Sequence, residues 1–173
     1  MNEPLHLPRG NARPQWTCRA VARDTEIAKF RRQMVILSML EHLLTPISFA
    51  QIITSLFLAI LFLQSGLDKA FNFADNFSWL QGHFSKTVFR GQVKSMLVCI
   101  TITEVLAGAV ALIGAAQCLI AGQKTFAIYG AQLAALDILL LFFGQRIAKD
   151  YAGAAALVPY FILCVGEIVL LTL

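Results

Sequence analysis

Four long apolar runs follow one another along the chain, at about residues 46–67, 96–121, 125–144 and 152–173. A helix needs roughly 20 mostly apolar residues to cross a bilayer, and each run is long enough. The connections 122–124 and 145–151 are short, so the helices on either side of them must run in opposite directions. The pattern therefore predicts an all-α membrane protein with four transmembrane helices in an antiparallel up-down bundle.

A shorter pattern lies in the one long connection, between the first two runs. Phe73, Phe77, Leu80 and Phe84 recur at the spacing of a single helix face, and Trp79 stands beside them. Tryptophan and a one-sided apolar face are typical of helices that lie in the headgroup layer. We therefore expect an interfacial amphipathic helix between spans one and two.

The N-terminal part divides differently. Residues 1–33 are polar and basic, whereas residues 34–44 are apolar but too short to span a membrane, so they suit a lead-in helix at the interface. Thr45 and Pro46 fit the N-cap and first helical position of span one. We predict a basic polar tail over 1–33 and a four-helix transmembrane domain over 34–173.

Composition supports a membrane location. The chain is 58% hydrophobic with a mean hydropathy of +0.70, too apolar for one soluble core of 173 residues. Its net charge of +4 is concentrated in the tail, where no base-reading motif or aromatic platform accompanies it; nucleic acid is thus a poor partner and membrane lipid with anionic headgroups a better one.

Basic residues also predict the orientation. Positive residues collect on the cytoplasmic side of a membrane protein. One side of the predicted bundle has the seven basic residues of the tail and Lys124, against six on the other: Lys69, Lys86, Arg90, Lys94, Arg146 and Lys149. We expect both termini to be cytoplasmic, in a bacterial inner membrane.

Three of the four runs contain a single acid each: Glu104, Asp137 and Glu167. A carboxylate costs about 2.5–3.5 kcal/mol or more at the centre of a membrane helix, so these groups should face one another or a polar partner. Glu104 lies about nine residues into its run and Asp137 about eight before the end of the next, which predicts equal depth from the same side.

Possible partners lie at that end of the bundle. Asp68 and Lys69 close span one and Arg146 opens the last connection, so a basic stem from Lys69 or Arg146 can reach the acidic pair. Glu167 should lie nearer the other face. Its partner stays open between Gln117, Gln132 and a helix end.

Cofactor chemistry has little support in the sequence. All three histidines fall outside the four runs, which excludes a haem held by two intramembrane histidines, and the four cysteines include no C-x-x-C pair. We expect no metal and no cofactor bound by this chain alone, other than a quinone or lipid. The acids then have three interpretations: a structural polar network, a pocket for a quinone headgroup or similar small ligand, or a path for protons or ions.

Three segments carry a resemblance. Residues 62–69 (Phe-Leu-Gln-Ser-Gly-Leu-Asp-Lys), 103–108 (Thr-Glu-Val-Leu-Ala-Gly) and 144–151 (Gly-Gln-Arg-Ile-Ala-Lys-Asp-Tyr) are similar to the DoxX family of four-helix bacterial membrane proteins, in the forms of Bacteroidetes-type bacteria. The likeness covers about residues 46–173. The span-one exit motif, which includes Gln64, is matched by Ser65, Gly66, Asp68 and Lys69, and the span-two acid by Glu104.

The resemblance implies an inner-membrane bundle that is linked in some members to quinone-dependent oxidation of thiosulfate. It transfers no catalytic residue, so whether the protein is an enzyme stays open. We therefore predict an integral inner-membrane subunit of a quinone-linked, respiratory-type electron-transfer assembly, with other subunits as partners and no redox centre of its own. The alternatives are a small oligomeric transporter or proton-coupled permease, and a purely structural membrane anchor.

Overall fold

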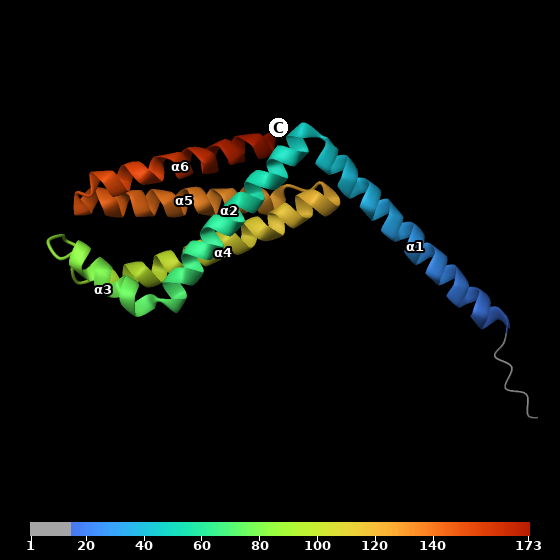
Figure 1. The fold of residues 1–173 in the computed structure, drawn as a ribbon, viewed down its shortest axis with the longest axis horizontal. Helices are drawn as coiled ribbons and strands as arrows, with labels where there is room; N and C mark the ends of the chain where they lie inside the picture. The colour runs from blue at the N-terminus through green and yellow to red at the C-terminus, as the bar shows by residue number, and fades with distance from the viewer. Residues whose placement is uncertain (1–14) are drawn as a thin grey trace, which may run out of the picture. The chain divides into compact units, whose positions relative to one another are not determined.

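The computed structural model describes the backbone of residues 15–173 and the side chains of Arg23 and residues 26–173. This part of the chain forms the helices α1 (Gln15–Leu44), α2 (Pro46–Phe71), α3 (Phe73–His83), α4 (Val93–Ala121), α5 (Thr125–Ala148) and α6 (Tyr151–Thr172) (Figure 1). Four of them, α2, α4, α5 and α6, are long and apolar enough to cross a membrane. The protein is thus a helical, multi-pass membrane protein, as the apolar runs predict.

The helices extend past the apolar runs that predicted them. α2 continues four residues beyond residue 67, and α5 continues four beyond residue 144. Polar side chains near a membrane surface cost little, so a helix does not have to end where its apolar stretch ends. The extensions keep Asp68, Lys69 and Arg146 on regular helix, which fixes the direction of each side chain.

The chain forms two compact units, residues 1–37 and residues 38–173, and α1 crosses the boundary between them. In the first unit, the predicted division at residue 33 is not a break in secondary structure. α1 begins at Gln15, so residues 34–44 are helical, but as the end of a longer helix that starts within the predicted tail. The sequence has no proline or glycine between Pro14 and Pro46 to interrupt it. The start of the predicted tail, residues 1–14, lies outside the described residues.

In the second unit, α2 begins where the sequence predicted. Pro46 occupies the first helical turn and Thr45 is the N-cap residue. The Thr45 hydroxyl does not cap α2, however, because it donates to the carbonyl of Glu41 at 3.0 Å. The threonine therefore bonds back to the helix before it rather than to the one that it precedes.

The core of the second unit lies where α4 packs against α2 and α5, and α5 packs in turn against α6 (Figure 1). Small residues make these contacts possible. A Cβ atom at Gly108 would come within 2.6 Å of the Leu63 backbone in α2, and one at Gly130 within 2.7 Å of the Ala111 backbone in α4. Close backbone approach of this kind is how helices gain packing energy in lipid, where apolar side chains are not driven together by water.

α3 is present as the aromatic stripe predicted, ending at His83. The rings of Phe73 and Phe77 stack with centroids 6.4 Å apart. Phe84, the residue after the helix, is 6% exposed, whereas no residue of α3 itself is fully buried. The helix contacts α2 and α4, so it covers part of the bundle end without entering the core.

Candidate functional site

The first buried polar group joins α2 to α4. The ammonium Nζ of Lys69 lies 2.9 Å from Oε1 of Glu104 and 2.7 Å from the hydroxyl of Ser65. Ser65 donates to the same Glu104 oxygen at 3.0 Å. Ser65 and Lys69 are four residues apart, so they share one face of α2. Glu104 is 1% exposed, and the sequence expectation that Lys69 or Arg146 reaches the acids is met by Lys69.

The second group joins α4 to α5. Asp137 is also 1% exposed, and its Oδ1 is hydrogen-bonded to the hydroxyl of Thr103. Thr103 is the neighbour of Glu104 in sequence, so the two acids lie at about the same depth, as their positions in the runs predict. Among the described residues no hydrogen bond links the two carboxyls directly. We name Ser65, Lys69, Thr103, Glu104 and Asp137 the upper polar cluster.

The third acid has a separate partner. The hydroxyl of Ser55 in α2 donates to Oε1 of Glu167 in α6 at 2.5 Å. Nearby, the Gln51 amide donates to the Leu170 carbonyl at 2.8 Å. Ser55 is none of the alternatives that the sequence left open for Glu167: Gln132 is exposed, and the carbonyl oxygen of Gln117 has no hydrogen bond among the described residues.

An apolar layer separates Glu167 from the upper polar cluster. Ser55 and Ser65 are ten residues apart on α2, which corresponds to about 15 Å along the axis. Between them, Leu58, Ala59 and Phe62 are at most 2% exposed and face the core. No chain of hydrogen bonds among the described residues crosses this layer.

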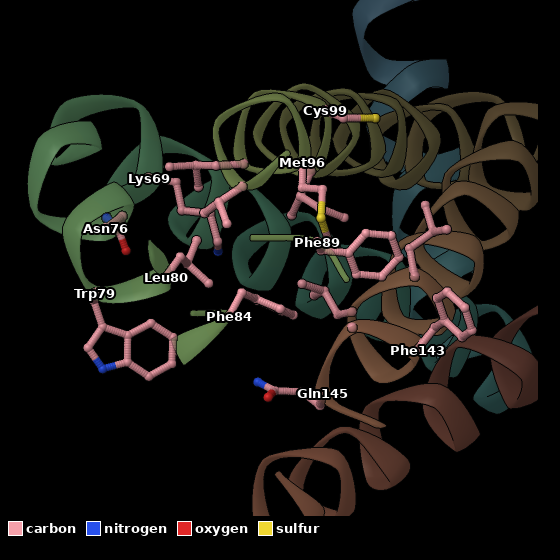
Figure 2. A pocket seen from close by; sticks show the side chains of 16 residues that line it. Lys69, Asn76, Trp79, Leu80, Phe84, Phe89, Met96, Cys99, Phe143 and Gln145 are labelled. Atoms are coloured by element: carbon pink, nitrogen blue, oxygen red, sulfur yellow. The ribbon is translucent and has the colours of Figure 1, made fainter. Parts of the chain in front are cut away.

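A cavity of about 410 Å³ opens beside the upper polar cluster, under α3 and between α4 and α5 (Figure 2). Its wall is mostly apolar and rich in rings. The aromatic lining residues are Trp79, Phe84, Phe89 and Phe143, and the polar ones are Lys69, Asn76 and Gln145. Ile100 and Leu141 in the wall are each within about one helical turn of a cluster residue, so the cavity and the cluster are adjacent.

α3 forms one edge of this cavity, and contacts of His83 fix its position. His83 stacks on Trp79 with ring centroids 4.9 Å apart, and its Nε2 lies 3.0 Å from Oε1 of Gln145. Asp150, which caps α6 by accepting from the Gly153 amide at 2.8 Å, lies 4.0 Å from the same His83 nitrogen. Polar side chains thus tie the short helix to the α5–α6 junction.

Besides Glu167, three predicted site residues do not join the cluster. Gln64 and Asp68 are exposed, and Asp68 accepts from the Asn72 amide at 2.8 Å. Each precedes a cluster residue by one position, which turns its side chain by about 100° on the helix. Arg146 lies over the ring of Tyr151, 4.8 Å from the centroid, so it forms a cation–π contact and does not neutralise an acid.

Sequence reasoning missed Ser55, Thr103 and the cavity. One signal was available for the hydroxyls: Ser55 recurs with Ile52, Ala59 and Phe62 at helical spacing, so it falls on the buried face of its apolar run. Nothing in the sequence indicates the cavity, because its walls come from four separate helices and the 84–92 connection. No cluster of three potential metal ligands occurs in the part of the chain that the structure describes.

Comparisons with family models, with curated proteins and with solved structures yield no match to this sequence.

Proposed function

We propose that this protein is an integral membrane subunit that binds a quinone, or a lipid-phase molecule with a similar ring headgroup, in the cavity beside Lys69. The observation that carries the proposal is the combination of an aromatic, mostly apolar cavity of about 410 Å³ with a half-buried, ion-paired lysine in its wall. Ligand sites are typically apolar cavities with a few polar groups that fix orientation.

The wall residues match the parts of a quinone. The rings of Phe84, Phe89 and Phe143 offer faces for a flat headgroup. The Lys69 ammonium and the Gln145 amide can donate hydrogen bonds to its two carbonyl oxygens. Because the walls are apolar, the tail of such a molecule can remain in lipid.

The two alternative functions predict different arrangements. A transporter or proton-coupled permease needs a polar route across the bundle, and the Leu58, Ala59 and Phe62 layer interrupts the one that the buried acids suggest. A purely structural anchor needs the polar bridges but no cavity beside them. The quinone proposal is the one that accounts for both the polar cluster and the cavity.

The remaining parts of the proposal concern the surroundings. We propose an antiparallel up-down bundle in a bacterial inner membrane, with α3 in the headgroup layer and both termini in the cytoplasm. We also propose that the protein belongs to the DoxX family, because residues 62–69, 103–108 and 144–151 are similar to segments of that family. This similarity also supports a role in a quinone-linked electron-transfer assembly, in which partner subunits hold the redox centres.

A cavity-filling variant tests the central claim. A Cβ at Gly144 would only touch the Phe84 ring at 3.6 Å, so Gly144→Leu should fold and fill the cavity. Gly166→Leu is the matched control, because a Cβ there meets nothing within 4 Å on exposed α6 surface. The purified protein in nanodiscs is titrated with a short-chain quinone, and quenching of Trp79 in the cavity wall is followed.

We expect Gly144→Leu to weaken quinone binding by about tenfold or more, a loss of about 1.4 kcal/mol at the lower limit. Gly166→Leu should bind as the wild type does. Equal affinities for the two variants, or no saturable quenching in the wild type, would contradict the proposal. Copurification with redox subunits in mild detergent tests the assembly separately.

A further inference from the structure

The Thr103 hydroxyl lies within hydrogen-bond distance of three acceptor oxygens but has only one proton to donate. Its hydroxyl oxygen lies 3.0 Å from the carbonyl oxygen of Ile100 and 3.2 Å from that of Cys99, the usual geometry of a helical threonine that donates back to its own helix. The same oxygen is also hydrogen-bonded to Oδ1 of Asp137. A hydroxyl supplies one proton and two acceptor lone pairs, so only one of these oxygens can receive the proton.

Glu104 shows the contrasting arrangement. Its Oε1 accepts from the Lys69 ammonium and from the Ser65 hydroxyl, and both partners are donors. This is the environment of an ionised carboxylate. Among the described residues, Lys69 is the one cation of the cluster, and it is paired with Glu104.

The charges around Asp137 then determine whether its carboxyl group is protonated. The charged groups on the other packed helices lie elsewhere: Arg146 is over Tyr151, Lys94 is exposed on α4, and Glu167 in α6 bonds to Ser55. An ionised Asp137 would add a second carboxylate to a buried cluster with one ammonium, and two neighbouring like charges in a low-dielectric site repel strongly. A protonated Asp137 removes the repulsion and supplies the missing proton for its bond to Thr103.

We infer that Asp137 is a proton-binding site, in which the carboxylic acid donates to Thr103 Oγ1 while Thr103 donates to its own helix. Its other oxygen, Oδ2, is buried and has no hydrogen bond among the described residues. Leu140 and Leu141, one turn further along α5, line the cavity. About one helical turn, a rise of some 5.4 Å along α5, thus separates Asp137 from residues that line the cavity.

At this position Asp137 can supply a proton to a ligand in the cavity. This role, unlike the protonation of Asp137 itself, rests on the proposed function. When a redox centre of a partner subunit, as proposed above, donates an electron to the quinone, the quinone oxygen beside Lys69 gains negative charge and becomes a base. The O–H bond of Asp137 can then break and a new O–H bond form on the ligand, directly or through water, which leaves Asp137 as a carboxylate. Asp137 is accordingly the proton reservoir of the cavity.

Infrared spectroscopy of the ligand-free protein in nanodiscs tests the proton itself. The C=O stretch of a protonated carboxyl is separate from the carboxylate and amide bands, and it shifts when the protein carries ¹³C-labelled aspartate. We expect the wild type to contain one protonated aspartate per chain. Asp137→Asn should remove that band, and Thr103→Val should shift it because the acceptor is lost. Glu104→Gln should weaken it, because Lys69 then has no carboxylate partner and Asp137 can ionise without repulsion.

Asp75→Asn is the matched control, since Asp75 is exposed on α3 and its loss should remove only carboxylate signal. A wild-type spectrum in which ¹³C-aspartate shifts carboxylate bands alone would overturn the inference. The isotope experiment needs no variant to fold. It is also independent of quinone, so an acid band without quinone binding would refute the proposed function and leave the proton site intact.

Discussion

The Lys69–Glu104 pair offers a sharp energetic prediction. Glu104 is 2% exposed at its side chain and Lys69 is 20% exposed, so the carboxylate depends on the lysine much more than the lysine depends on it. Removal of one partner from a buried pair typically costs 3–5 kcal/mol, because the other charge is left uncompensated. Since Lys69 reaches some solvent and Ser65 still donates to Glu104, we expect Lys69→Met to cost about 3 kcal/mol, at the lower end of that range.

The other members of the cycle should cost less. Glu104→Gln keeps an acceptor for Ser65 and leaves a lysine that can turn toward water, so we expect about 1 kcal/mol. The double variant leaves no buried charge and should also cost about 1 kcal/mol. The two single variants would then sum to about 4 kcal/mol against about 1 for the double, which gives a coupling energy of about 3 kcal/mol.

Reversible unfolding in mixed micelles, driven by increasing denaturing detergent, measures each free energy. Lys94→Met is the matched control, because Lys94 is exposed near the start of α4. Lys69→Met that is no less stable than Lys94→Met would refute the reasoning. Additive single variants would do so as well, since additivity would mean that the two side chains do not interact.

Three further outcomes follow from packing and hydrogen bonding. Gly114→Ala should destabilise the bundle by about 1–3 kcal/mol in the same unfolding assay, because its Cβ would collide with the Ala127 backbone, whereas Gly166→Ala should have no effect. Ser55→Ala removes the one hydrogen bond that the Glu167 carboxyl makes among the described residues and should cost about 1–3 kcal/mol, while Ser78→Ala on exposed α3 surface should have no effect; equal losses would contradict this. Single cysteines placed along 73–83 should react with a water-soluble maleimide at every third or fourth position. Uniform labelling would contradict the placement of α3 in the headgroup layer.

The apolar pattern was sufficient for the secondary structure of the spanning part. Runs of about 20 apolar residues have few stable states other than a helix in lipid, because every backbone polar group must be hydrogen-bonded within its own segment. The stripe from Phe73 to Phe84 was similarly sufficient for α3. The pattern was insufficient at Gln15–Leu44, where a polar helix continues into an apolar one, since a change in polarity is not a break in helix propensity.

Burial of the acids was equally determined by the sequence, but their partners were not. The cost of a carboxylate in lipid requires Glu104, Asp137 and Glu167 to face inward on any bundle. Which hydroxyl or ammonium each one meets depends on the rotation and axial offset of two helices, and those are set by the small-residue contacts such as Gly108 against Leu63. Ser55 and Thr103 look like ordinary members of apolar runs until that packing brings them to an acid.

The cavity belongs entirely to the tertiary structure. Its walls combine α3, the 84–92 connection, α4 and α5 around the end of Lys69 in α2, and it exists because α3 covers the bundle end without filling it. Periodicity along one helix reports which face is buried, not how much space remains between faces of different helices. The sequence therefore determined a membrane bundle with buried acids, and only the packing decided that one acid pairs with Lys69, one bonds to Thr103, and both adjoin a space large enough for a ligand.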